Sequence, residues 1–212
     1  MVSPSVNKLV ESFKIPSIPT TNGELTYATL HAMHEFLNSN AASVTTNLGC
    51  CTFGHLCLTL SPTFYANLST TIVIVPPNPG ATPVIPSGAT GPEEASICYT
   101  YDAATLAFNT FNNVDCALCQ KLIGAVKDTF LRVKHKPHCR YSGSSTLDML
   151  THLYKTYAII SNADWLVNDK CFHEAYLPTV PIEVSWRQID NAVAYADAGS
   201  TPYSSKQVVD NA

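Results

Sequence analysis

The chain has 212 residues, of which 46% are apolar and only 13% are charged, about half the charged share of an average soluble protein. This length allows one large domain or two small lobes, and the apolar content is sufficient for a buried core. The net charge of -4 argues against a strong general nucleic-acid binder. So few charges instead predict either surfaces that contact other protein surfaces or a poorly soluble fragment.

The start of the chain lacks the basic and apolar regions of a signal peptide. The longest apolar run, residues 72–75, is too short to cross a bilayer. Without a secretory route, the eight cysteines are interpreted as reduced thiols. We therefore expect an intracellular, cytoplasmic protein with no membrane partner.

The predicted fold class is mainly α. Residues 1–24 are predicted to form an extended N-terminal arm that contains one short helix, over residues 6–13. Residues 25–136 are predicted to form a helical N-terminal region. Its first helix, over residues 26–38, is indicated by three apolar residues at helical spacing: Leu30, Met33 and Leu37.

Residues 49–60 fit either a strand or a buried helix, because the alternation of leucines there is compatible with both. Ser61 and Pro62 are typical of the cap and the first position of a helix. The stretch 76–92 holds six prolines and three glycines, which exclude regular structure. We interpret it as a semi-extended loop or linker.

Pro92 is followed by two acidic residues, a strong start signal for a helix. From there to about residue 134 the pattern predicts one long helix or a broken pair. Residues 144–212 are predicted to form a small C-terminal helical lobe, with the boundary in residues 137–143.

Within the lobe, the pairs Ser145 with Asp148 and Ser161 with Asp164 mark two helix starts. Gly199 is expected to end a further helix, which follows Pro181, in the left-handed conformation. The apolar stripes of these helices predict the lobe core: Leu147, Leu150, Leu153, Tyr157, Leu166, Trp186, Ile189 and Val193.

Four residues have the donor chemistry of a zinc site: Cys116, Cys119, His135 and Cys139. Two cysteines separated by two residues are a common first half of such sites. Here the pair falls within a helical pattern rather than a tight turn, which favours partly buried thiols. Cys50 and Cys51 near His55 suggest a thiol nucleophile, but no third group that would orient the base is evident. We predict no catalytic residue, no cofactor and no small-molecule substrate.

Half of the basic residues fall within residues 121–140, where Asp128 is the single acid. The six are Lys121, Lys127, Arg132, Lys134, Lys136 and Arg140. A solvated helix end is the simpler interpretation. The alternative is a nucleic-acid-binding module that contacts phosphates through these residues and is stabilised by zinc.

Several segments together resemble the Gag (capsid) proteins of copia-type LTR retrotransposons, in the divergent form found in protist and algal genomes. The segments are 111–133, 146–157, 164–174 and 181–189, with the closing run 196–204. The motifs are apolar patterns and contain no catalytic signature. The residues 38–44 and 54–60 extend the resemblance toward the N-terminus.

The resemblance implies a retroelement-capsid-like fold and a structural, non-enzymatic protein that associates with copies of itself. It further implies a shell around retroelement RNA. Members of that family often carry a zinc knuckle after the capsid lobe, and this sequence has none. We therefore expect at most weak RNA contact and a truncated last helix in the lobe.

Overall fold

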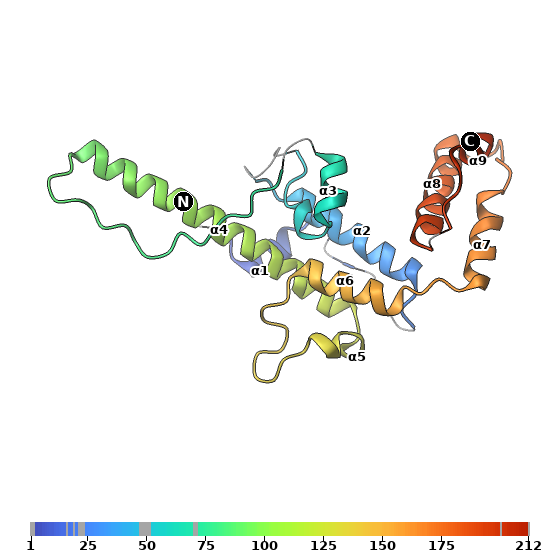
Figure 1. Cartoon of the computed structure of the whole chain (residues 1–212), viewed down its shortest axis with the longest axis horizontal. Coiled ribbons are helices and arrows are strands. Elements are labelled where there is room, and N and C mark those ends of the chain that lie inside the picture. The colour runs from blue at the N-terminus through green and yellow to red at the C-terminus, as the bar shows by residue number, and fades with distance from the viewer. Residues whose placement is uncertain are drawn as a thin grey trace. The chain divides into compact units, whose positions relative to one another are not determined.

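The computed structural model describes residues 3–15, 17–18, 20, 24–46, 52–69, 72–199 and 201–211. These residues form helices joined by turns and loops, with no named strand among them (Figure 1). The prediction of a mainly α fold is confirmed. The chain divides into two compact units, an N-terminal unit Met1–Tyr154 and a C-terminal unit Lys155–Ala212.

The N-terminal unit contains α1 (Val6–Ser12), α2 (Tyr27–Ser43), η1 (Leu56–Leu58), α3 (Pro62–Leu68), α4 (Gly91–Ala125), α5 (Asp128–Leu131), η2 (Arg132–Lys134) and most of α6 (Thr146–Tyr157). Its core consists of leucine, methionine and valine side chains from α2, α4, α5 and α6. The most deeply buried are Leu30, Met33, Leu37, Val114, Leu118, Leu122, Leu131, Met149, Leu150 and Leu153.

The described part of residues 1–24 packs onto this core instead of extending from it. Helix α1 lies against α4, with Leu9 and Phe13 buried. The backbone N–H of Ile15 donates to Asn40 Oδ1 (2.9 Å), and Asn40 Nδ2 donates back to the Ile15 carbonyl (2.9 Å). Because the Asn40 side chain is fully buried, this pair holds the first segment against α2.

The segment that fitted either a strand or a buried helix forms turns and the short η1 where it is described. Gly54 has a φ of +52°, and a Cβ there would lie 2.5 Å from the Ala42 carbonyl oxygen and 2.6 Å from that of Val44. Only glycine allows the backbone to approach the end of α2 this closely.

The start of α4 is a capping box, in which the Thr90 side chain and the Glu93 carboxylate satisfy each other's backbone N–H groups. The helix ends at Ala125, and α5 follows after a short break, so of the two predicted forms, one long helix or a broken pair, the structure has the broken one. Its buried residues begin at Val114. Residues 91–110 project from the unit, with the proline-rich loop alongside (Figure 1), and Tyr101 Oη donates to the Gly80 carbonyl (3.2 Å).

The proline-rich loop has neither helix nor strand over residues 72–90, in agreement with the interpretation as a semi-extended loop. Across the described residues, no helix has an apolar stretch long enough for a bilayer.

Helix α6 belongs with the N-terminal unit, so the division follows Tyr154 and not the predicted stretch 137–143. The Thr146 N–H donates to Asp115 Oδ1 (3.0 Å), and the Thr146 hydroxyl donates to the Asp115 carbonyl (3.2 Å). Thr146 is fully buried, so α4 supplies an additional acceptor at the first turn of α6. This contact joins residues far apart in the sequence and leaves no local signal.

The C-terminal unit contains α7 (Asn162–Phe172), α8 (Ile182–Ala198) and α9 (Ser205–Asn211). The predicted start at Ser161 and Asp164 is confirmed as a capping box, and Ser145 with Asp148 form the equivalent pair before α6. Pro181 is the N-cap of α8. The left-handed conformation predicted for Gly199 is wrong, because its φ is -79°.

Candidate functional site

The core of the C-terminal unit is a small cluster formed by Phe172, Ile189 and Ala192. The Phe172 ring stacks on Tyr203, with ring centroids 3.8 Å apart and an interplanar angle of 8°. Val193 and Val208 are partly buried against the cluster. Three short helices therefore share one narrow apolar centre.

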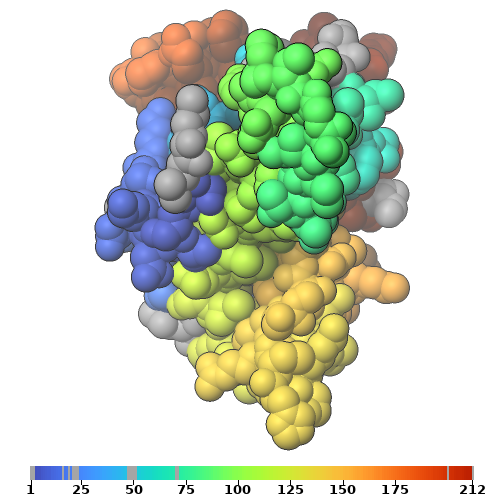
Figure 2. Space-filling model, turned by 90° about the vertical axis from the view of Figure 1, so that its left-hand side faces the viewer, coloured from blue at the N-terminus to red at the C-terminus, as the bar shows by residue number. Residues whose placement is uncertain are grey.

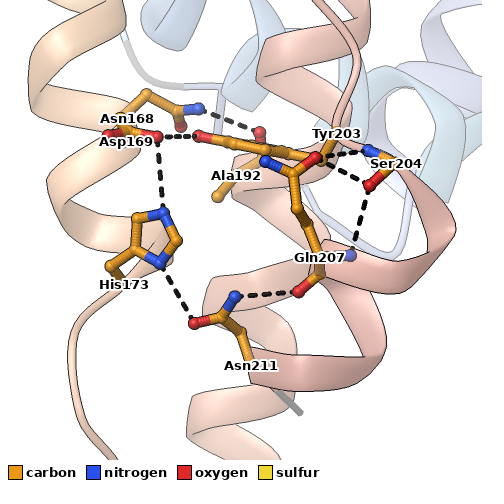
Figure 3. A network of polar contacts seen from close by, with 8 residues as sticks. All are labelled: Asn168, Asp169, His173, Ala192, Tyr203, Ser204, Gln207 and Asn211. Carbon is orange, nitrogen blue, oxygen red and sulfur yellow. Dashed lines mark hydrogen bonds and ion pairs between the residues drawn. The ribbon is translucent and has the colours of Figure 1, made fainter.

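A chain of polar contacts closes over this centre and holds α9 against α7 (Figure 3). The Tyr203 hydroxyl donates to Asp169 Oδ1 (3.2 Å), and His173 Nε2 lies 3.7 Å from the same oxygen. His173 Nδ1 is hydrogen-bonded to Asn211 Oδ1 (3.1 Å). Burial and the nearby Asp169 charge raise the pKa of Tyr203 to about 12, so this hydroxyl remains a donor at neutral pH.

The beginning of α9 is fixed within its own first turn. The Ser204 N–H donates to Gln207 Oε1 (2.8 Å), and the Gln207 N–H donates to Ser204 Oγ (3.3 Å) (Figure 3). This is a capping box of the Ser-x-x-Gln type. The pattern is visible in the sequence and would have identified the exact start of this helix, which was predicted near Lys206.

Helix α8 carries a continuous apolar stripe that the unit covers over only half of its length. Ile182, Trp186, Ile189 and Val193 recur at spacings of three or four residues and share one helix face. Ile189 is 6% exposed, whereas Ile182 is 41% and Trp186 50% exposed. Trp186 was predicted to lie in the core, and this prediction is wrong.

Leu166, also predicted in the core, is 64% exposed. Helix α7 turns Phe172 inward instead, and its neighbour Val167 is exposed as well. Ile189, Leu150 and Leu153 are buried as predicted, while Leu147, Tyr157 and Val193 are half-buried. The C-terminal unit therefore has more large apolar side chains at its surface than in its centre.

The six basic residues of the segment 121–140, called the basic segment below, do not form one helix end. Lys121 lies on α4 and Lys127 precedes α5, while Arg132 and Lys134 lie in η2. Lys136 and Arg140 face each other across an isolated antiparallel bridge, in which the Lys136 N–H donates to the Arg140 carbonyl (2.7 Å). His138 and Arg140 adopt positive φ angles of 68° and 48°, so the chain turns back tightly there.

The four candidate zinc ligands are not brought together. Within the described residues, no group of three or more His, Cys, Asp or Glu side chains could hold a metal. Cys119 is buried and its sulfur lies 3.2 Å from Thr146 Oγ1, and this burial raises the pKa of its thiol to about 12. Cys116 and Cys139 are exposed, and the His135 ring packs edge-on against Tyr141.

Cys50 and Cys51 lie outside the described residues. His55, the base considered for them, is 1% exposed, and its Nδ1 is hydrogen-bonded to the Val44 carbonyl (3.0 Å). His34 points into the unit, where Nε2 contacts the Thr59 carbonyl (3.0 Å) and Nδ1 contacts the Tyr154 hydroxyl (3.3 Å). Burial lowers the pKa of both histidines. These hydrogen bonds connect separate segments of the N-terminal unit and so have a structural role.

No protein-family model, curated protein or solved structure matches the chain.

Proposed function

We propose that this chain is a structural protein that associates with copies of itself, and that the uncovered half of the α8 stripe carries the contact. The single observation behind this proposal is the change along one helix face from buried Ile189 to half-exposed Trp186 and Ile182. A stripe that continues past its own core is covered when a second apolar surface packs on it.

The size of the C-terminal unit supports the same proposal. Domains of roughly 60 residues bury only about 60% of the surface of their unfolded chains and are marginally stable. This unit fully buries only two large apolar side chains, Phe172 and Ile189, within its cluster. Burying one half-exposed tryptophan and one isoleucine in each copy would add apolar area comparable to that core.

The charges beside the stripe favour a second copy as the partner. Glu183 and Arg187 are exposed on one flank of α8, and within the described residues neither forms an ion pair. If two α8 helices pack antiparallel about a two-fold axis near Ser185, Glu183 of each copy lies opposite Arg187 of the other. Such a pairing is self-complementary, as a symmetric dimer requires.

Light scattering coupled to size-exclusion chromatography tests the proposal over a wide concentration range. At about 0.3 M salt, where exposed ionic contacts are largely screened, we expect a reversible dimer for the natural sequence and a monomer for Trp186→Ala. Val184→Ala is the matched control, since Val184 lies on the opposite face of α8 and is 38% exposed. A monomer at every concentration, or an unchanged dimer in Trp186→Ala, would contradict the proposed contact.

A charge exchange distinguishes this interface from nonspecific association. Glu183→Arg alone places like charges opposite each other and should weaken the dimer several-fold. Adding Arg187→Glu to the same chain restores opposite charges and should recover the dimer. If the double variant is no better than the single one, the antiparallel arrangement is wrong even if a dimer forms.

The resemblance to retrotransposon capsid proteins supports the further proposal that such a dimer forms part of a larger shell around RNA. The specific observation in favour of RNA is the exposed set Arg132, Lys136 and Arg140 around the tight turn of the basic segment. Phosphate contacts of this kind weaken steeply with added salt. RNA affinity that is unaltered when Lys134, Lys136 and Arg140 become alanine would exclude this second function.

A further inference from the structure

The projecting half of α4, residues 91–110, has a one-sided chemical character. Its three charged residues are all acidic: Glu93, Glu94 and Asp102. No lysine, arginine or histidine occurs anywhere from residue 72 to residue 120. Glu93 is committed to the capping box with Thr90, whereas Glu94 and Asp102 are exposed.

One face of this projecting half combines acid and apolar groups. Tyr99, Asp102, Ala103 and Leu106 are spaced as positions i, i+3, i+4 and i+7 of a helix. Tyr99 is 76% exposed, and the proline-rich loop contacts a different face, through Tyr101. A helical segment without tertiary packing is only marginally stable in water, so docking on another surface would stabilise it.

The basic segment has the complementary character. Val133 is 80% exposed and lies between Arg132 and Lys134 in η2, with exposed Lys136 nearby in the sequence. In the part of the chain that the structure describes, Arg132, Lys134, Lys136 and Arg140 form no ion pair with a carboxylate. An apolar group flanked in the sequence by cations fits an apolar strip that carries an acid, Asp102.

The two surfaces cannot satisfy each other within one copy, because the projecting half of α4 extends away from the basic segment (Figure 1). Viewed toward the end of α4, the two occupy separate parts of the surface of the N-terminal unit (Figure 2). Pairing of two projecting halves would place like charges together. The attractive combination therefore joins the projecting half of one copy to the basic segment of another.

We infer that the N-terminal unit carries this head-to-tail contact, in which a second copy of the chain docks its projecting half of α4 on the basic segment. The contact is heterologous, because different surfaces meet, so it generates rings or open chains and not a closed dimer. It is independent of the α8 pairing, and together the two contacts would extend dimers into larger assemblies. The exposed Val133 favours this occupant over RNA, which would engage only the cations.

Two charge reversals and their mixture test the inference. The first variant is Asp102→Lys, and the second is Arg132→Glu with Lys134→Glu. Glu93 stays unchanged because it caps α4. In sedimentation velocity at about 0.05 M salt, we expect species larger than the dimer for the natural sequence, and none for either variant alone. An equimolar mixture of the two variants restores opposite charges and should recover the large species.

Several outcomes would overturn the inference: no species beyond the dimer for the natural sequence, variants that assemble normally, or a mixture that fails to recover. If only RNA binding is lost in the Arg132 and Lys134 variant while assembly is unchanged, the segment is an RNA contact instead. Far-UV circular dichroism verifies folding, and the neutral variant Asp102→Asn gives a milder second test. Trp186→Ala in the same assay removes the dimer step alone, which keeps failure of the α8 contact distinguishable.

Discussion

Replacing Phe172 by alanine is expected to unfold the C-terminal unit and leave the N-terminal unit intact. The Phe172 side chain is 1% exposed and stacks on Tyr203 at the centre of the cluster. Truncating a buried phenylalanine to alanine costs about 3–5 kcal/mol. A unit of roughly 60 residues has a stability of about 3–9 kcal/mol, and the small cluster of this unit favours the low end of that range, where the truncation removes all of it.

The positions of the two tryptophans make this measurable. Trp165 and Trp186 both lie in the C-terminal unit, so their fluorescence reports that unit alone. The far-UV circular dichroism arises mostly from the helices of the other unit, of which α2 and α4 are the longest. For Phe172→Ala in dilute protein without denaturant, we expect the red-shifted emission of exposed indole together with most of the helical signal.

Leu166→Ala is the matched control in the same unit. Leu166 is 64% exposed, so its truncation should change the urea midpoint by no more than the equivalent of about 0.5 kcal/mol. A native emission spectrum and an unchanged midpoint in Phe172→Ala would refute the assignment of the core. So would a Leu166→Ala variant as unstable as Phe172→Ala.

Three further predictions concern the N-terminal unit. Gly54→Ala should destabilise it by at least about 2 kcal/mol in urea unfolding, because the added Cβ meets two carbonyl oxygens of the α2 terminus at a positive φ. Cys119, whose thiol pKa is raised to about 12 by burial, should react with iodoacetamide last among the described cysteines, as peptide mass spectrometry can follow. Burial lowers the pKa of His34 and His55, so as the pH falls these histidines are protonated in the unfolded chain before they are protonated in the folded one. The melting temperature should therefore stay constant above about pH 6.5 and fall as the pH drops toward the lowered pKa values of the folded protein. Replacement of both histidines by glutamine should flatten that dependence.

Local signals in the sequence predicted the helix starts well. The pairs Ser145 with Asp148 and Ser161 with Asp164 each act within one turn, so four consecutive residues determine the outcome. Ser61 before Pro62 likewise begins α3 as predicted, with the Phe64 N–H donating to the serine hydroxyl. The mainly α class follows from the same local information.

The inward face of α7 could not be predicted in this way. Trp165, Leu166, Val167 and Phe172 distribute apolar side chains around the helix, so periodicity does not single out one side. Packing against Ile189 and Tyr203 selects Phe172. Leu166 is left in solvent for the same reason.

The candidate interaction surface was partly predictable. The stripe from Ile182 to Val193 is evident in the sequence, but periodicity alone assigns all of it to a core. The covered length of the stripe depends on the helices that the unit supplies. Helices α7 and α9 cover it only from Ile189 toward the C-terminal end of α8. The face of α4 that contains Tyr99 was missed, because its exposure depends on the distance between that helix and the rest of the unit.

The acceptor that Asp115 provides for Thr146 has a practical consequence for dividing the protein into pieces. A fragment beginning at residue 144 would retain α6 but lose the carboxylate at its first turn. It would also expose Met149, Leu150 and Leu153 to water, and such a piece should aggregate regardless of any native tendency to associate. Cutting after Tyr157 avoids both problems, and measurements of oligomeric state on isolated pieces are interpretable only from that junction onward.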